Sequence, residues 1–229
     1  MGALIDAVLF DAGGVLVVPD PAAIAPVFRR FGADPRPEDV VRAHYAGMRA
    51  QDAQATEHDD WDLYRMHLVL ACGVPPDDAV PAAVALHEVW SPYLWRYPLA
   101  AAVSALFHLH RRGVPIGVVS NASGQIEGVL AAQGVCQVGV GGGVPVQVIV
   151  DSEVAGVMKP DPAIFAPALE VLGLPADRVG YAGDSVRNDV RGAEAAGLVP
   201  LHLDPHDDHP DAPHRRIRSL HDLLDLVAP

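Results

Sequence analysis

Four short segments of the chain carry polar groups of the kinds that phosphoryl transfer needs. Asp11, Ser120 and Asp184 each follow an apolar run, and Lys159, the only lysine of the chain, precedes a predicted helix. A carboxylate such as Asp11 can attack phosphorus and form an aspartyl-phosphate. Two aspartates that face one another repel unless a hard cation such as Mg²⁺ lies between them, and this cation also holds phosphate oxygens. A hydroxyl, backbone N–H groups and an ammonium group would hold the other phosphoryl oxygens.

The elements that must position these groups alternate between strands and helices. After a first strand, residues from about 22 to 90 have helical spacing and no convincing strand. The later alternation predicts an α/β fold with a doubly wound parallel sheet, which binds ligands at the carboxyl ends of its strands. The predicted strands are Ala3–Phe10, Val114–Ser120, Gln147–Val150, Val179–Ala182 and Val199–Leu203, and the helices after residue 98 are Leu99–Arg112, Gly124–Gln133, Pro162–Leu172, Val186–Ala196 and Ile217–Val227.

The helical block interrupts the sheet after its first strand. We therefore expect a core domain made of residues 1–19 and 93–229, with a helical domain at residues 20–92 inserted into it.

The composition is that of a globular protein with a strong excess of acidic residues. The 229 residues include 16 Lys+Arg and 29 Asp+Glu, a formal charge of −13. This balance argues against nucleic-acid binding and against binding to anionic membranes. Cys72 and Cys136 lie in apolar runs and lack the spacing of a disulfide framework or a zinc site. Because no apolar run reaches transmembrane length and Met1–Phe10 does not resemble a signal peptide, we expect a cytoplasmic protein.

A polar stretch near the C-terminus, from Asp204 to His214, is rich in proline and histidine. The histidines in and beside it are His202, His206, His209 and His214. Histidine is a common ligand of transition metals. The irregular spacing favours an exposed loop, and the sequence leaves open whether this segment binds a metal.

The segments around the four groups resemble the four motifs of the haloacid dehalogenase superfamily. In chain order these segments are Phe10–Leu16, Val118–Asn121, Lys159–Phe165 and Gly183–Asp189. Any one motif is weak evidence, whereas four in the right order are specific, and the resemblance covers nearly the whole chain. It implies a Rossmann-like core, and it identifies the helical block as the cap of the family, a mobile lid that closes over substrate.

The resemblance also implies a role for individual residues. Asp11 would be the nucleophile, and Lys159 would neutralise negative charge at the reacting centre. The phosphate-binding positions would be Ser120, Asn121 and Lys159. Mg²⁺ would be bound by Asp11, by Asp184 and by the backbone carbonyl of Gly13. Asp189 would also belong to the metal site, where it would hold either the water shell of the metal or Lys159.

Gly13 departs from the pattern of the family. Most of its phosphatases have a second aspartate here, which protonates the leaving group and then activates water. This general acid, worth about 10²–10⁴-fold in rate, is missing. Within the helical block, His44, Asp20 and Glu57 are available as replacements, and the sequence does not choose among them.

Three functions follow from these observations. The first is a Mg²⁺-dependent hydrolase that acts on a small phosphorylated metabolite through an aspartyl-phosphate. The second is a binding or regulatory protein on the same fold, with its chemistry weakened at Gly13. The third is a 2-haloacid dehalogenase, but these enzymes use no metal and would have serine where this chain has Asp184. The identity of the substrate and the choice between monomer and dimer are not readable from the sequence.

Overall fold

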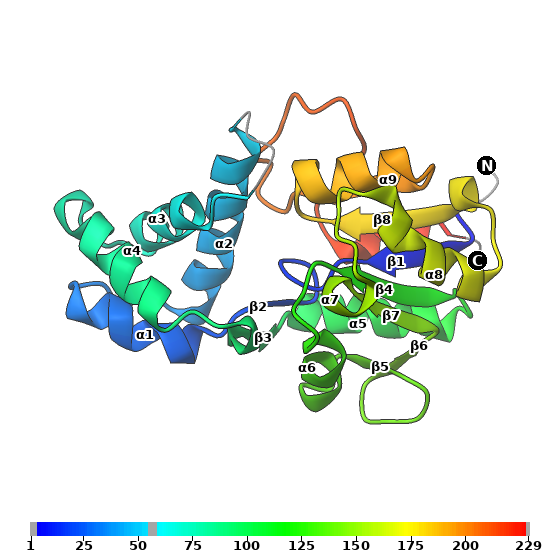
Figure 1. The fold of residues 1–229 in the computed structure, drawn as a ribbon, viewed down its shortest axis with the longest axis horizontal. Helices are drawn as coiled ribbons and strands as arrows, with labels where there is room; N and C mark the ends of the chain where they lie inside the picture. Colours follow the sequence, from blue (N-terminus) through cyan, green and yellow to red (C-terminus); the bar gives the residue numbers. More distant parts are fainter. Residues whose placement is uncertain (1–3, 55–58, 228–229) are drawn as a thin grey trace. The chain divides into compact units, whose positions relative to one another are not determined.

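A six-stranded parallel sheet is the centre of the computed structural model (Figure 1), which describes residues 4–54 and 59–227. Its strands are β1 (Ala7–Phe10), β4 (Ile116–Ser120), β7 (Val148–Asp151), β8 (Val179–Gly183), β9 (Val199–Leu203) and β10 (Arg216–Ile217). They lie in the order β10-β9-β8-β1-β4-β7, and each neighbouring pair is parallel. The chain first adds β4 and β7 on one side of β1 and then returns to add the others on the opposite side. The predicted doubly wound α/β fold is therefore confirmed.

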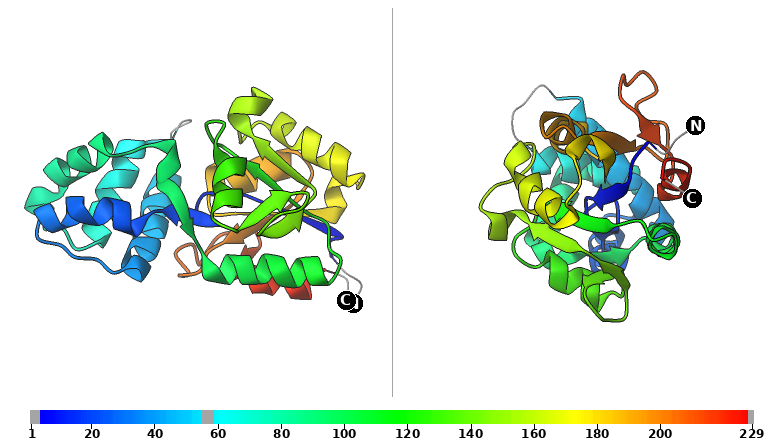
Figure 2. Two further views of the ribbon diagram at one scale, coloured as in Figure 1. Left: turned by 90° about the horizontal axis from the view of Figure 1, so that it is seen from below. Right: turned by 90° about the vertical axis from the view of Figure 1, so that its right-hand side faces the viewer.

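Helices cover both faces of this sheet (Figure 2). They are α5 (Ala100–Arg111), α6 (Ile126–Ala132), α7 (Ser152–Ala155), α8 (Ala166–Leu172) and α9 (Arg191–Ala195). One face packs against α8 and α9, and the other packs against α5 together with a 3₁₀ turn at Leu220–Asp225. Every residue of β1, β4 and β8 is buried, which explains why these strands are nearly continuous apolar runs in the sequence.

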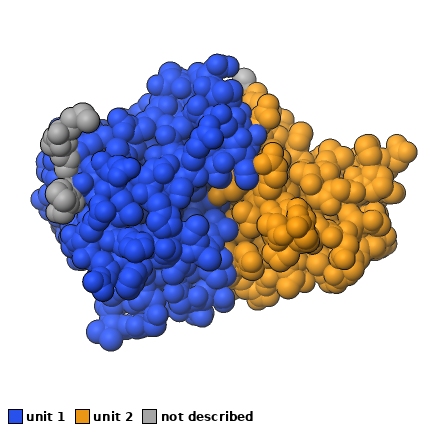
Figure 3. Space-filling model, turned by 180° about the vertical axis from the view of Figure 1, so that it is seen from behind, with its two compact units in different colours: residues 1–17, 98–229 blue, residues 18–97 orange. Residues whose placement is uncertain are grey.

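The chain divides into two compact units, coloured separately in Figure 3. The sheet unit comprises residues 1–17 and 98–229, and the helical unit comprises residues 18–97. Two short strands, β2 (Val17–Pro19) and β3 (Trp95–Pro98), lie where the chain passes between the units and pair with one another. The domain boundaries expected from the sequence stay a prediction.

The helical unit is built from α1 (Pro21–Arg30), α2 (Pro37–Asp52), α3 (Trp61–Ala71) and α4 (Ala79–Glu88). Apolar side chains at helical spacing, such as Ile24, Tyr64 and Leu68, meet in one buried cluster. The helical pattern predicted for residues 22–90 is confirmed in the described part of this block. Across the described residues, no helix combines the length and the apolar character needed to span a bilayer.

The predicted helix over Ile217–Val227 is wrong. The segment begins with β10 at the edge of the sheet and continues as a 3₁₀ turn at Leu220–Asp225. The backbone N–H of Asp204 donates to the carbonyl of Ile217 at 2.9 Å, so edge pairing holds the start of the segment extended. Its apolar spacing fits a short strand followed by a turn as well as a helix face, so periodicity alone did not distinguish them.

Two other predicted helices are not α-helical throughout, and four short strands were missed in addition to β10. A 3₁₀ turn at residues 162–165 precedes α8, and a π turn at residues 186–190 precedes α9. These four strands are β2, β3, β5 (Cys136–Val138) and β6 (Val144–Val146). The side chain of Gln137 bonds to the backbone of Gly139 and Gly143 and so closes the glycine-rich turn between β5 and β6.

Candidate active site

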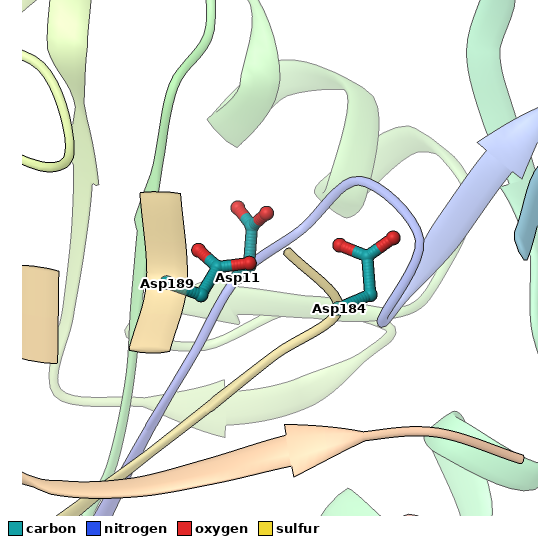
Figure 4. Close-up of side chains that lie close together, drawn as sticks. All are labelled: Asp11, Asp184 and Asp189. Carbon is teal, nitrogen blue, oxygen red and sulfur yellow. The ribbon is translucent and has the colours of Figure 1, made fainter. Parts of the chain in front are cut away.

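Three carboxylates converge at the carboxyl edge of the sheet (Figure 4). Asp11 follows β1 and Asp184 follows the adjacent strand β8, with Phe10 paired to Ala182 in the register. Asp11, Asp184 and Asp189 each offer an oxygen atom, and these atoms lie within 4.8 Å of one another. Among the residues that the structure describes, this is the only group of three or more His, Cys, Asp or Glu side chains close enough to share a metal ion.

The carboxylate of Asp189 is directed to the site by the π turn that follows β8. The backbone N–H of Ser185 donates to Oδ2 of Asp189 at 2.9 Å. A Cβ atom on Gly183 would lie 2.2 Å from Cγ of Asp189. Glycine at position 183 is therefore needed for Asp189 to lie against the end of β8.

Lys159 is buried among these carboxylates. Its Nζ donates to Oδ1 of Asp189 at 2.7 Å and lies 3.0 Å from Oδ1 of Asp11. It also donates at 2.8 Å to the hydroxyl of Tyr181, which in turn donates to the carbonyl of Val119 at 2.8 Å. Burial opposes the charge of Lys159, but the attraction of the two carboxylates outweighs burial and raises the pKa of Lys159 above its ordinary value.

Burial raises the pKa of Asp11 to about 7; Lys159 opposes this shift, whereas Asp189 and Asp184 add to it. Asp11 and Asp189 thus share one ammonium group while Asp184 adds a third negative charge beside Asp11, so an additional cation would relieve the repulsion among the carboxylates. All the side-chain donors are oxygen atoms, which is the set that a hard divalent cation such as Mg²⁺ prefers. The three residues therefore fit a metal ion of this kind, with Asp11 and Asp184 at the ends of neighbouring strands.

The other predicted site residues lie around this cluster. Ser120 is buried at the end of β4, and its side chain hydrogen-bonds to Asp11. Asn121 follows it, but its side chain holds the backbone of Lys159: Nδ2 donates to the Lys159 carbonyl at 3.0 Å, and Oδ1 accepts from the Lys159 N–H at 2.8 Å. Gly13 lies two residues beyond Asp11 and forms an isolated bridge with Val17. Phosphate binding by Asn121 stays a prediction.

The sequence did not predict Tyr181 as part of the site, nor the contact by which Asn121 holds the backbone of Lys159. Tyr181 lies inside an apolar strand, where a single hydroxyl gives no signal of its partner. The side-chain contact of Asn121 joins residues 38 positions apart. Only the fold could reveal these two interactions, because nothing in the local sequence encodes a distant backbone partner.

The candidate replacements for a general acid belong to the helical unit. His44 is buried, and its Nδ1 lies 2.9 Å from the hydroxyl of Tyr64. Asp20 accepts the N–H of Ala22 at the start of α1 and pairs with Arg96 at 2.9 Å. Glu57 lies outside the described residues. The two described candidates thus have structural partners of their own.

The segment Asp204–His214, expected to form an exposed loop, departs from that expectation at Asp204, which is only 3% exposed. Its other residues are half-buried or exposed, and His202, just before the segment, is 1% exposed within β9. The carboxylate of Asp204 accepts the backbone N–H groups of Asp208 and His209 and the guanidinium group of Arg216. These bonds fold the segment back on itself, and the rings of His209 and His214 each lie with their centroids 4.9 Å from that of His202.

The chain belongs to the haloacid dehalogenase-like hydrolases, because residues 5–197 match the model of that family. It is 31% identical over 170 residues to the glyceraldehyde 3-phosphate phosphatase of Methanopyrus kandleri, covering 70% of this chain and 69% of that protein. It is also 31% identical over 145 residues to haloacid dehalogenase-like hydrolase domain-containing protein 3 of Mus musculus, covering 62% of this chain and 55% of that relative. The crystal structure of the 2-haloacid dehalogenase of Pseudomonas syringae pv. Tomato has a TM-score of 0.55 at 23% identity, with 97% of both chains covered, which shows the shared fold. The resemblance seen in the four motifs is thereby confirmed.

Proposed function

We propose that this hydrolase is a Mg²⁺-dependent phosphatase that acts on a small phosphorylated metabolite. The observation that carries the proposal is the gathering of Asp11, Asp184 and Asp189 at one point, with Lys159 paired to Asp11 and Asp189. An aspartate at position 184 supports a metal site, whereas a dehalogenase would have serine there. The name of the Methanopyrus relative supports a phosphorylated substrate.

The residues of the chain would divide the reaction into two displacements. A carboxylate oxygen of Asp11 bonds to phosphorus, and the leaving oxygen departs with the bonding electrons. Water then attacks the phosphorus atom, which releases inorganic phosphate and restores the carboxylate. Ser120 and Lys159, both beside Asp11, hold oxygens of the phosphoryl group, and the ammonium group offsets its charge. The chemistry that Mg²⁺ supplies when bound at the three carboxylates is neutralisation of charge on the phosphoryl oxygens.

The helical unit would be the cap that excludes water from this site, in keeping with the family resemblance. Gly13 favours one alternative: a protein that binds a phosphorylated ligand without turning it over. The same assay separates the two, because the alternative predicts no phosphate release above a blank.

Removal of metal is expected to lower phosphate release about 10²-fold or more, because the carboxylate cluster would then repel the anionic substrate. We would follow phosphate release from p-nitrophenyl phosphate and a panel of sugar and acid phosphates, with Mg²⁺ and with EDTA. Mg²⁺ added back in excess of EDTA should restore turnover. Turnover that EDTA leaves intact would contradict the metal dependence. Halide release from 2-haloacids in EDTA would favour the dehalogenase instead.

Replacing Asn121 with alanine is expected to lower kcat/KM about 10²-fold, because the backbone of Lys159 loses both partners and its ammonium group moves relative to Asp11. Asn121→Asp should be less affected, since it keeps the acceptor and loses only the donor. Ser123→Ala, at an exposed position of the same loop, serves as the matched control. Wild-type kinetics in Asn121→Ala would show that Lys159 needs no such support.

A further inference from the structure

His202 lies beside the end of the strand that carries Asp184. It belongs to β9, and the register pairs it with Gly183, the residue just before Asp184. Its ring hydrogen-bonds to the backbone of Asp184. This bond favours the protonated ring, so the backbone group is the carbonyl and the ring nitrogen is the donor.

A second histidine contacts the other nitrogen of this ring. Nδ1 of His202 lies 2.9 Å from Nε2 of His214, which leaves Nε2 of His202 for the carbonyl of Asp184. His202 is only 1% exposed, and the centroids of the two rings lie 4.9 Å apart. His214 thus holds one nitrogen of the His202 ring while the other reaches Asp184.

The segment that carries His214 is itself held in place. Asp204 follows β9, is only 3% exposed, and accepts the guanidinium group of Arg216 at 3.0 Å. Arg216 lies in β10, which pairs with His202 and Leu203 of β9. His214 thus lies two residues from a strand anchored beside His202, so its ring is presented to His202 by the sheet itself.

We propose that His202, oriented by His214, is a positioning residue that holds the main chain of Asp184 and thereby sets the affinity of the carboxylate cluster for its metal ion. The inference rests on the proposed function only in taking Asp184 as a metal ligand. Groups that orient a ligand from behind typically change metal affinity about 10–100-fold when they are removed. The bond reaches Asp184 through its carbonyl, so its loss would let the end of β8 move and displace the carboxylate from Asp11.

Direct metal binding tests the inference without turnover. Mn²⁺ would be titrated into metal-free full-length protein, and the electron paramagnetic resonance signal of free Mn²⁺ would give the dissociation constant. We expect His202→Phe, which keeps a ring and lacks the donor, to raise this constant about 10–100-fold. His202→Gln, whose Nε2 amide can donate to the same carbonyl, should recover much of the affinity.

Leu201→Val is the matched control for a general loss of stability. Leu201 lies in the same strand with 1% exposure, and its side chain lies beside Gly180, four residues before Asp184. The Leu201→Val substitution should lower the melting temperature of the protein and leave Mn²⁺ binding unchanged. Equal weakening of Mn²⁺ binding by Leu201→Val and His202→Phe, or wild-type affinity in His202→Phe, would overturn the inference.

A second variant keeps the test decisive if His202→Phe does not fold. His214→Phe removes the hydrogen-bond partner of Nδ1 of His202 without touching Asp184, and we expect it to weaken Mn²⁺ binding several-fold. Unchanged Mn²⁺ binding in His214→Phe would overturn the orienting role of His214. Wild-type protein that binds Mn²⁺ but releases no phosphate would contradict the proposed function and leave this inference standing, whereas wild-type protein that binds no Mn²⁺ would overturn the inference.

Discussion

Asp11→Asn is expected to lose phosphate release by at least about 10³-fold in kcat while the protein stays folded. An amide oxygen is a poor nucleophile toward phosphorus, so no phospho-enzyme forms. The substitution also removes one of the two carboxylates that pair with Lys159. Loss of the whole first displacement makes this the largest loss of activity expected of any single change.

Stability should move in the opposite direction to activity. The pKa of Asp11 is raised to about 7, chiefly by burial, so the folded state binds its proton more tightly than the unfolded chain does. The stability that this proton gives is lost as pH rises from about 4 to about 7. Asparagine carries no such charge, and Lys159 keeps Asp189 and Tyr181 as partners. Without metal at pH 8, Asp11→Asn should therefore melt no lower than the wild type.

Asp6→Asn is the matched control for this experiment. Asp6 lies just before β1, at the edge of the sheet opposite to Asp11, and pairs with Arg178 at 2.7 Å. The same change of carboxylate to amide there should leave kcat unaltered. Turnover of Asp11→Asn at the wild-type rate would contradict the covalent mechanism. A melting temperature of Asp11→Asn below that of the wild type would show that ion pairing of Asp11 stabilises the fold more than its burial destabilises it.

The strand ends that carry the site could be predicted because two local signals coincide there. Apolar runs that stop at Asp11, Ser120 and Asp184 mark both a buried strand and the residue that leaves it. Parallel pairing then requires these residues to share one edge. The helix predicted over Ile217–Val227 failed because its spacing was ambiguous and a partner strand decided the outcome.

The supporting interactions could not be predicted, because they join the chain across long separations. The hydroxyl of Tyr181 reaches Lys159 from 22 residues away, and the ring of His202 reaches the backbone of Asp184 from a different strand. A tyrosine or histidine in an apolar run has the same sequence signature whether its polar atom serves a site or only satisfies a buried group. Burial and geometry, not residue type, separate these cases.

Gly13→Asp is expected to raise turnover of substrates with poor leaving groups about 10²–10⁴-fold. An alkoxide must receive a proton as it departs, whereas p-nitrophenolate leaves readily without one. The gain should therefore be large for sugar phosphates and small for p-nitrophenyl phosphate. The measurement is kcat/KM for a series of substrates whose leaving groups differ in pKa. We expect kcat/KM to fall steeply with rising leaving-group pKa in the wild type and only slightly in the variant.

The backbone at this position is compatible with the change. Gly14 has a φ of 72°, in the left-handed region that favours glycine, whereas Gly13 is not among the described glycines with positive φ. Gly13→Asn adds a side chain of the same size without an acid and is the matched control. A gain in Gly13→Asp alone would show that proton donation is what this chain lacks. The opposite outcome is that Gly13→Asp, Gly13→Asn and the wild type have equal rates, and that kcat/KM depends only weakly on the leaving group in all three. This result would mean that another residue already supplies the proton.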